Sequence, residues 1–373
     1  MPAHSHRIQK KEAPLFSTSA LCFGFFSLFC LFLILRNSDI AILYMTRGLI
    51  LCAKTVIPSL FPFMVISELI LSLGIGELLC RPFAPLCRFL FRISKTGACA
   101  VLLGMLCGFP IGAKCAMTAL ENGKIDRLEA ERILNFSNNP SSAFLISAVG
   151  VSLWGNRRFG ITLYIIALLS QILTGILFAR LKKESLSHIP SEAKAPHTPR
   201  PFGIGIFTDA VRNSCFSMLL VCAYVVFFSA LVGTLGILLD RFSLPPVFSA
   251  AVFCLFELSG GVSNAAALPS PTVAALLTAF AIGWSGLSVH CQILSICDGH
   301  GIRFRSYFLS KILQGVLCVL LLWGAITAFP TLLLPAQEAV GITLTPLFPL
   351  PLITLLFLLA LPSCFYKKPA RSS

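Results

Sequence analysis

The feature that most constrains this chain is a set of long runs without a single charged residue. Lipid offers the backbone no hydrogen-bond partners, so a segment that crosses a membrane must satisfy its own amide and carbonyl groups. Each run is long enough to cross about 30 Å of hydrocarbon as a helix. The runs cover residues 15–35, 133–156, 159–179, 213–239, 312–337 and 339–366. The sequence therefore predicts an all-α polytopic membrane protein.

The overall composition supports this class. The 373 residues are 56% apolar with a mean hydropathy of +0.87, and only 12% are charged, whereas soluble domains carry roughly a quarter charged residues. Arg7, Lys10 and Lys11 precede the first run, as in a signal peptide. That run is too long for a signal core, and no small-x-small cleavage site follows before Arg36. We therefore predict that it is the first span.

The net charge of +14 indicates topology rather than nucleic-acid binding. Basic residues gather at the N-terminus and within residues 81–95, 180–200, 303–305 and 367–371. Because basic loops stay on the cytoplasmic side, all five clusters and both termini are predicted to be cytoplasmic. The chain has no aromatic-basic surface or soluble domain for nucleic acid, so the expected partner is the lipid bilayer.

The chain is predicted to divide into two membrane halves. Residues 182–201 combine charges with four prolines, a composition that cannot support a packed core and is typical of a flexible cytoplasmic linker. The N-terminal half covers residues 15–181 and the C-terminal half residues 202–366. Residues 1–14 and 367–373 form cytoplasmic tails.

Each half contains a polar stretch that interrupts its apolar sequence. The first contains Gly108, Pro110, Gly112 and Lys114, and the second runs from residue 286 to residue 292. Glycine and proline break helices, and discontinuous helices build the binding sites of many transporters that arose from internal repeats. The two halves are predicted to be distantly related, since Gly108 and Gly286 each stand fifteen residues before a further glycine.

Topology favours a hairpin at each polar stretch. If every apolar run crossed the membrane, the basic linker would lie outside, against the positive-inside rule. Re-entrant hairpins around residues 96–120 and around residues 286–292 restore the agreement. The prediction is about eight transmembrane helices plus two re-entrant hairpins.

Several polar side chains fall inside these apolar regions, where a charge needs a partner or a water-filled cavity. Lys114 could face an anion or an acidic partner, or snorkel to the interface. The acids Glu68 and Glu257 could serve in ion pairs or in a site. His290 and Gln292, with Ser288, could bind a ligand or bridge packed helices. Asn138 belongs to a polar patch before Pro140 that could bind a ligand or cap a helix.

No catalytic or metal-binding pattern stands out. The fifteen cysteines show no C-x-x-C, and most lie in apolar runs, where cysteine behaves as a small hydrophobic residue. There is no phosphate-binding loop and no nucleophile–base arrangement. We expect no enzymatic activity, no metal and no cofactor.

Four strings resemble the family of sporulation integral membrane proteins of the YlbJ type. They are V-I-P-S-L-F-P-F (56–63), G-F-P-I-G-A-K (108–114), E-A-E-R-I-L-N-F-S-N-N-P (129–140) and G-L-S-V-H-C-Q (286–292). Their order and spacing also match, over residues 48–320. The chain departs from the family's pattern in its cysteine-rich spans and in its Asn-Asn-Pro string, which leaves the ligand contacts open.

The resemblance implies a multi-pass protein of the bacterial cytoplasmic membrane, acting in the mother cell and needed for the spore cortex. The wider group carries the nucleoside recognition or Gate domain, which implies a transporter-like fold with two hairpin-bearing repeats. We hypothesise that the protein moves or senses a small polar solute, alone, as a homo-oligomer or with sporulation membrane partners. The alternative is a scaffold that recruits cortex-assembly proteins without transport.

Overall fold

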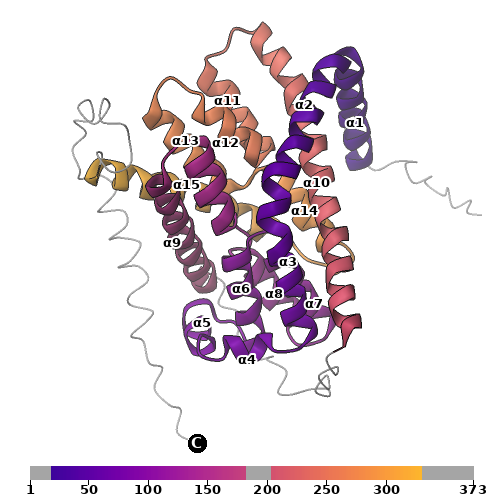
Figure 1. Ribbon diagram of the computed structural model, residues 1–373, viewed down its shortest axis with the longest axis vertical. Helices are drawn as coiled ribbons and strands as arrows, with labels where there is room; N and C mark the ends of the chain where they lie inside the picture. Colours follow the sequence, from indigo (N-terminus) through magenta and orange to yellow (C-terminus); the bar gives the residue numbers. More distant parts are fainter. Residues whose placement is uncertain (1–17, 182–202, 330–373) are drawn as a thin grey trace, which may run out of the picture.

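The computed structural model describes residues 18–181 and 203–329, and this part of the chain is helical throughout, without strands. The predicted tails, the linker and the predicted last span, residues 339–366, lie outside the described residues. Figure 1 shows an elongated bundle with α4 and α5 at its lower end and α11 and α12 in its upper part.

The chain begins with helices that flank the bundle and then turns at its lower end. They are α1 (Thr18–Arg36), α2 (Ser38–Leu51), the π-helical η1 (Cys52–Val56), α3 (Ile57–Ser72), α4 (Gly76–Cys80) and α5 (Ala84–Phe91). The stretch from α2 through α3 runs as one apolar rod of 35 residues, with Pro58 in the first turn of α3 and Pro62 inside it. The rod packs along α10 of the second half.

The rest of the first half consists of a hairpin, a broken helix and a continuous helix. Hairpin 1 is α6 (Lys95–Cys107) and α7 (Ile111–Glu121), which pack against each other. The broken helix is α8 (Arg127–Leu134) and η2 (Phe144–Leu153), and α9 (Arg157–Leu181) follows. Ser94 caps α6 by accepting from the Gly97 amide, and Asp126 caps α8 by accepting from the Glu129 amide.

The second half repeats this order after one long helix, α10 (Ile204–Arg241). Hairpin 2 is α11 (Pro246–Phe256) and α12 (Leu258–Ala266), which also pack against each other. The broken helix is α13 (Pro271–Trp284) and α14 (Gly286–Ile296), and α15 (Arg305–Ala328) follows. Proline in the first turn starts α11 and α13 without the loss of a helical hydrogen bond.

This order corrects the predicted position of the second hairpin. The sequence around Gly286 was expected to turn back on itself, but α13 and α14 continue as one span of 26 residues with a break at Ser285–Gly286. The turn instead lies at Glu257, between α11 and α12. Hairpin 1 enters the bundle from the lower end in Figure 1 and hairpin 2 from the upper end.

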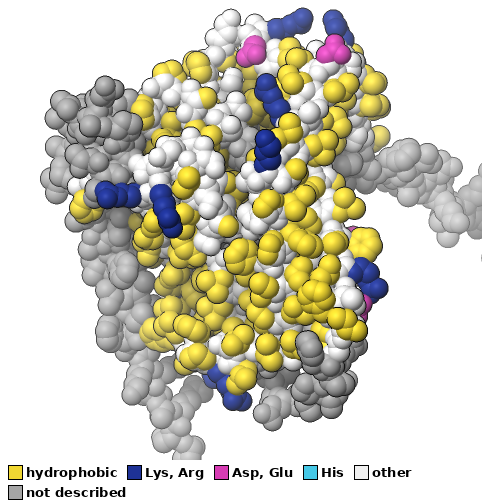
Figure 2. Space-filling view, viewed as in Figure 1, with side chains coloured by type: hydrophobic (Ala, Val, Ile, Leu, Met, Phe, Trp, Pro, Cys, Tyr) yellow, Lys and Arg dark blue, Asp and Glu magenta, His cyan; other side chains and the backbone are white. Residues whose placement is uncertain are grey.

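The outer surface identifies a multi-pass membrane protein. Five described helices are long and apolar enough to span a membrane, or six if α5 and α6, bent by 91°, count as one span. The predicted number of about eight crossings includes a span at residues 339–366, which lies outside the described part of the chain. Apolar side chains cover a broad area of the face in Figure 2, and large hydrophobic residues such as Phe25 and Phe216 point outward. Such a surface is stable only in contact with lipid or another apolar partner.

Candidate functional site: a pocket between two hairpin tips

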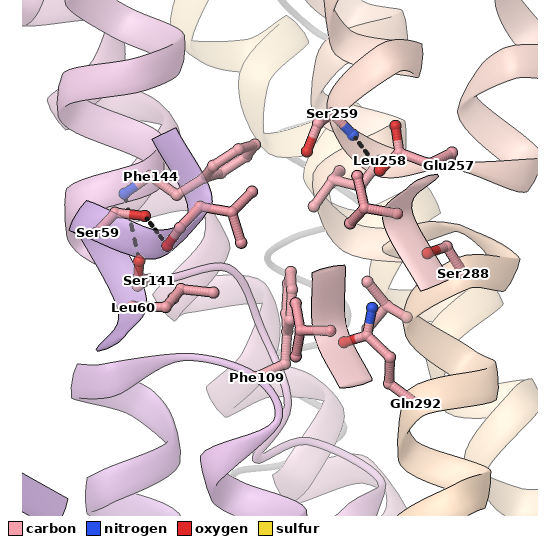
Figure 3. Close-up of a pocket in the computed structure, with 14 residues that line it drawn as sticks. Ser59, Leu60, Phe109, Ser141, Phe144, Glu257, Leu258, Ser259, Ser288 and Gln292 are labelled. Carbon is pink, nitrogen blue, oxygen red and sulfur yellow. Dashed lines mark hydrogen bonds between the residues drawn. The ribbon is translucent and has the colours of Figure 1, made fainter. Parts of the chain in front are cut away.

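A pocket lies in the middle of the bundle, where both hairpin tips and both helix breaks meet. Its cavity volume is about 20 Å³, which is room for about one water molecule. Its walls are Val56, Ser59, Leu60, Phe109, Ser141, Phe144, Val221, Val225, Glu257, Leu258, Ser259, Ser288, Val289 and Gln292. Figure 3 shows Ser141 and Phe144 on one side, Glu257, Ser288 and Gln292 on the other, and Phe109 between the two sides in the lower part of the view.

The tip of hairpin 1 packs directly on the break between α8 and η2, and we name this contact the first junction. Glycine is required here because backbone meets backbone. A Cβ at Gly104 or Gly112 would lie 2.2 Å from the Ser137 carbonyl oxygen, and one at Gly108 would lie 2.6 Å from the Ser141 amide nitrogen. Gly108 also has a positive φ of 84°. The predicted glycines therefore serve close packing in the first junction.

Hydrogen bonds hold this junction together. Oδ1 of Asn138 accepts from the Ala113 amide at 2.8 Å, which satisfies a donor in the first turn of α7, just after Pro110. The amide of Phe109 donates to the Asn139 carbonyl oxygen at 2.8 Å. Asn138 is fully buried, so its role is to cap the half-helix of hairpin 1 from the neighbouring break.

A buried lysine from α15 reaches the same break. The ammonium of Lys311 donates to the Asn138 carbonyl oxygen, to Asn139 Oδ1 at 3.1 Å and to Gln314 Oε1 at 3.1 Å. Gln314 Nε2 in turn donates to Asn139 Oδ1 at 2.5 Å. Both Lys311 and Gln314 are fully buried. An ammonium group from the second half of the chain thus donates hydrogen bonds to a backbone carbonyl oxygen and a side-chain amide oxygen of the first junction.

The second junction joins the tip of hairpin 2 to the break between α13 and α14. Glu257 is 3% exposed, and its carboxylate accepts from the Ser259 amide at 3.0 Å and the Gly260 amide at 2.5 Å. It therefore caps the N-terminus of α12, where the helix dipole favours a negative charge. Gly286 has a φ of 80°, and a Cβ at this position would lie 3.0 Å from the Leu258 amide nitrogen, so the break packs closely on the tip.

The second junction leaves polar atoms of α14 without partners. Within the described part of the chain, Ser288 Oγ and Gln292 Oε1 are buried and accept or donate no hydrogen bond. Both side chains line the pocket. A buried polar atom without a partner costs about 1–3 kcal/mol, and such atoms in a pocket mark a place where a ligand or water can bind.

His290 lies on the same helix but faces another way. Its Nδ1 lies 2.8 Å from the Tyr307 hydroxyl, and its ring packs edge-on against Trp284 and Phe308. Its Nε2 has no hydrogen-bond partner among the described residues. His290 does not line the pocket and joins α14 to α15 instead.

Lys114 and Glu68 form an ion pair away from the pocket. The Lys114 ammonium lies 2.9 Å from Glu68 Oε2 and also donates to Ser217 Oγ, while Asn213 Nδ2 donates to Glu68 Oε1. These contacts fasten α7 to α3 and α10. The sequence left three possibilities for the Lys114 ammonium: an anion, an acidic side chain or the membrane interface. The structure shows an acidic side chain, Glu68.

The structure thus brings together only part of the predicted set. Glu257, Ser288 and Gln292 line the pocket. Gly108, Pro110, Gly112 and Asn138 build the adjacent first junction, and Glu68, Lys114 and His290 lie outside the pocket wall.

Sequence reasoning missed the polar face of α15. Lys311 stands immediately before an uncharged run and reads as the flank of a span. The signal that identifies it is periodic, since Tyr307, Ser310, Lys311 and Gln314 follow the three- and four-residue spacing of one helix face. A polar stripe inside an apolar helix faces protein rather than lipid.

No group of three His, Cys, Asp or Glu side chains in residues 18–181 and 203–329 could hold a metal ion. The fold and the pocket define the class: a polytopic membrane protein in which two hairpins and two broken helices meet around a buried pocket. The chain is 31% identical over 313 residues to sporulation integral membrane protein YlbJ of Bacillus subtilis (strain 168), covering 74% of this chain and 76% of that protein.

The chain therefore belongs to the family of sporulation integral membrane proteins of the YlbJ type. No family model matches the sequence, and no solved structure matches the fold.

Proposed function

We propose that this protein binds a small, uncharged polar solute between its two hairpin tips, and moves or senses that solute during sporulation. The tips must move apart to admit it, because the cavity between them has room for about one water molecule. The observation that carries the proposal is a pair of unpartnered polar atoms in the pocket wall, Ser288 Oγ and Gln292 Oε1. The pocket lies where two hairpin tips and two helix breaks meet. Sites at the interface of repeats, built from discontinuous helices, are the usual solute sites of secondary transporters.

The charges around the pocket argue for an uncharged ligand. The Glu257 carboxylate is occupied by two backbone amides of α12. The Lys114 ammonium is held by Glu68, and the Lys311 ammonium by three oxygens of the first junction. The remaining wall offers the hydroxyl of Ser288, the amide of Gln292 and the aromatic ring of Phe109. Such a wall suits a ligand with an apolar face and hydrogen-bonding groups.

Membership of the family supports a role in sporulation. The relative's name describes a sporulation integral membrane protein, and we assign this chain the same role, in the mother-cell membranes and in support of the spore cortex. Both hairpins are proposed to be re-entrant and to act as the gates of a transporter-like Gate fold, with both termini cytoplasmic. The protein is proposed to act without enzymatic chemistry.

The test combines transport and stability. Wild-type protein and the variant Ser288→Ala with Gln292→Met are reconstituted in liposomes and assayed for uptake of nucleosides, amino acids and peptidoglycan precursors. Both changes remove unpartnered polar atoms from the pocket wall, so the variant should melt at or slightly above the wild-type temperature but lose uptake and sporulation. Uptake of no solute by the wild type, together with normal sporulation of the variant, would sink the proposal and favour the scaffold.

A matched control comes from α13. Thr278 is also buried, and its hydroxyl has no partner among the described residues, but it does not line the pocket. Thr278→Val removes this hydroxyl while it keeps the side-chain shape. The control variant should keep both stability and uptake.

A further inference from the structure

The most unusual polar group outside the pocket is the ammonium of Lys311. It is fully buried within the bundle on α15. All three hydrogen-bond partners found for it are neutral oxygens: the backbone carbonyl of Asn138 and the side-chain oxygens of Asn139 and Gln314. Because an ammonium group has three donors and no acceptor, these oxygens satisfy it completely.

No carboxylate neutralises this charge among the ion pairs that the structure shows. The buried acids have other partners: Glu129 accepts from the Ser94 amide, Glu131 binds Arg303, and Glu257 caps α12. The charge is balanced instead by oxygen dipoles of the unwound stretch between α8, which ends at Leu134, and η2, which begins at Phe144, together with the Gln314 side chain.

This arrangement is the chemistry of a monovalent-cation site. Unwound backbone carbonyls and helix C-termini bind Na⁺ in transporters built from broken helices. We name the three oxygens of Asn138, Asn139 and Gln314 around the ammonium the cage. Divalent ions prefer several carboxylates, and the cage contains none. We propose that the oxygens of Asn138, Asn139 and Gln314 form a monovalent-cation site that the ammonium of Lys311 fills permanently.

The proposal goes beyond solute binding and does not depend on it. An ammonium attached to α15 cannot leave, so the first junction needs no dissolved Na⁺ or K⁺ to close. It also joins the two halves, since the oxygens of Asn138 and Asn139 lie in the first half and Lys311 in the second. Removal of the side chain should therefore expose an empty cage that small cations can fill.

The experiment measures melting temperatures of purified, detergent-solubilised protein in chlorides of ammonium, methylammonium, potassium, sodium and choline at equal ionic strength. The wild type should melt at the same temperature in all five salts. Lys311→Ala should melt about 5 °C or more below the wild type in choline, and at least about half of this loss should return in a small cation. Lys114→Ala, which removes a partly exposed lysine, should show no such recovery.

A second variant decides the question if Lys311→Ala yields no folded protein. Lys311→Met keeps the length of the stem and fills the cage with an uncharged group, so it should melt below the wild type in every salt. Three results would overturn the proposal: a Lys311→Met variant as stable as the wild type, a folded Lys311→Ala variant that melts equally in all five salts, or a wild type stabilised by sodium or potassium over choline.

Discussion

The two junctions solve the same backbone problem with opposite charges. In each, a hairpin tip packs on a broken helix, and half-helices end with backbone groups that need partners. The first junction places the ammonium of Lys311 on oxygens of the unwound break that follows α8, and the second places the carboxylate of Glu257 at the N-terminal end of α12. The dipole of α12 favours the negative charge of Glu257, whereas the positive charge of Lys311 is held by neutral oxygens.

The junctions differ in what they leave unsatisfied. In the first junction, Asn138 Oδ1 accepts from the Ala113 amide, and the side chains of Asn139 and Gln314 bond to each other and to Lys311. Asn135 Oδ1 has no partner among the described residues, but it does not line the pocket. In the second junction, Ser288 and Gln292 keep polar atoms without partners. We therefore propose that the first junction is a fixed wall and that the second, whose unpartnered atoms line the pocket, is the wall that meets a ligand. The predictions below test this division.

The largest effect is expected where the fixed wall has no space. Gly112→Val adds a Cβ that would lie 2.2 Å from the Ser137 carbonyl oxygen, and no side-chain movement relieves a clash with backbone. The free energy of unfolding should fall by about 3 kcal/mol or more, seen as loss of folded protein in detergent. Gly205→Ala on α10, where a Cβ meets nothing within 4 Å, is the control and should be neutral or slightly stabilising. A well-folded Gly112→Val variant would show that the junction is loose.

The sequence predicted the first junction better than the second for a physical reason. Glycine and proline mark a break directly, since each changes the backbone itself, and Gly108, Pro110 and Gly112 were found in this way. The turn residue of hairpin 2 is neither glycine nor proline, and Gly260 and Gly261 follow it inside the first turn of α12. The turn is formed by Glu257 in extended conformation, and a single acid in an apolar run does not distinguish a turn from an ion pair.

The class of fold followed from the uncharged runs, because lipid allows few alternatives. The position of the second hairpin did not follow, since Gly286 breaks α13 from α14 without reversing the chain. The sequence also did not predict which side chains pair across the bundle. The Lys311 contacts join residues more than 170 positions apart, and spacing along one helix carries no information about such pairs.

A second prediction compares the two caps. Glu257→Ala removes the acceptor of two buried amides, and Asn138→Ala removes the acceptor of the Ala113 amide. Both should destabilise by about 1–3 kcal/mol, with the larger loss for Glu257→Ala because two donors lose their partner. Glu257→Gln keeps an acceptor oxygen and should recover part of the loss. Thermal melting of the three variants measures this order, and an equal loss for Glu257→Gln and Glu257→Ala would mean that the charge, not the cap, matters.

A third prediction concerns the ion pair that fastens hairpin 1. The side chains of Lys114 and Glu68 are 26% and 15% exposed, so their attraction is partly screened and should contribute about 0.5–1 kcal/mol. A double-mutant cycle with Lys114→Met and Glu68→Gln measures this coupling. Because neither side chain lines the pocket, both variants should retain solute uptake. Loss of uptake at normal stability would show that hairpin 1 also moves.

The smallest effect is expected at the base of hairpin 1, where His300 bridges two segments. Its Nδ1 lies 2.8 Å from the Asp298 carbonyl oxygen and its Nε2 lies 2.8 Å from Glu121 Oε1. Both partners are acceptors, so the protonated ring can donate to both of them, whereas the neutral ring can donate to only one. The hydrogen bond with the Glu121 carboxylate raises the pKa of His300 above its ordinary value.

A pKa raised in the folded state means that the bridge stabilises fully below the unfolded value of about 6.5 and is lost as pH rises through the folded value. The melting temperature of the wild type should therefore exceed that of His300→Gln at about pH 6, and the difference should shrink toward pH 8.5. The side chain of Glu121 is 59% exposed, so the loss of melting temperature in His300→Gln should be smaller than the loss in Lys114→Met. Glu121→Gln should abolish the pH dependence in the same way. A gap between wild type and His300→Gln that is constant with pH would mean that His300 is neutral and holds the hairpin by packing alone.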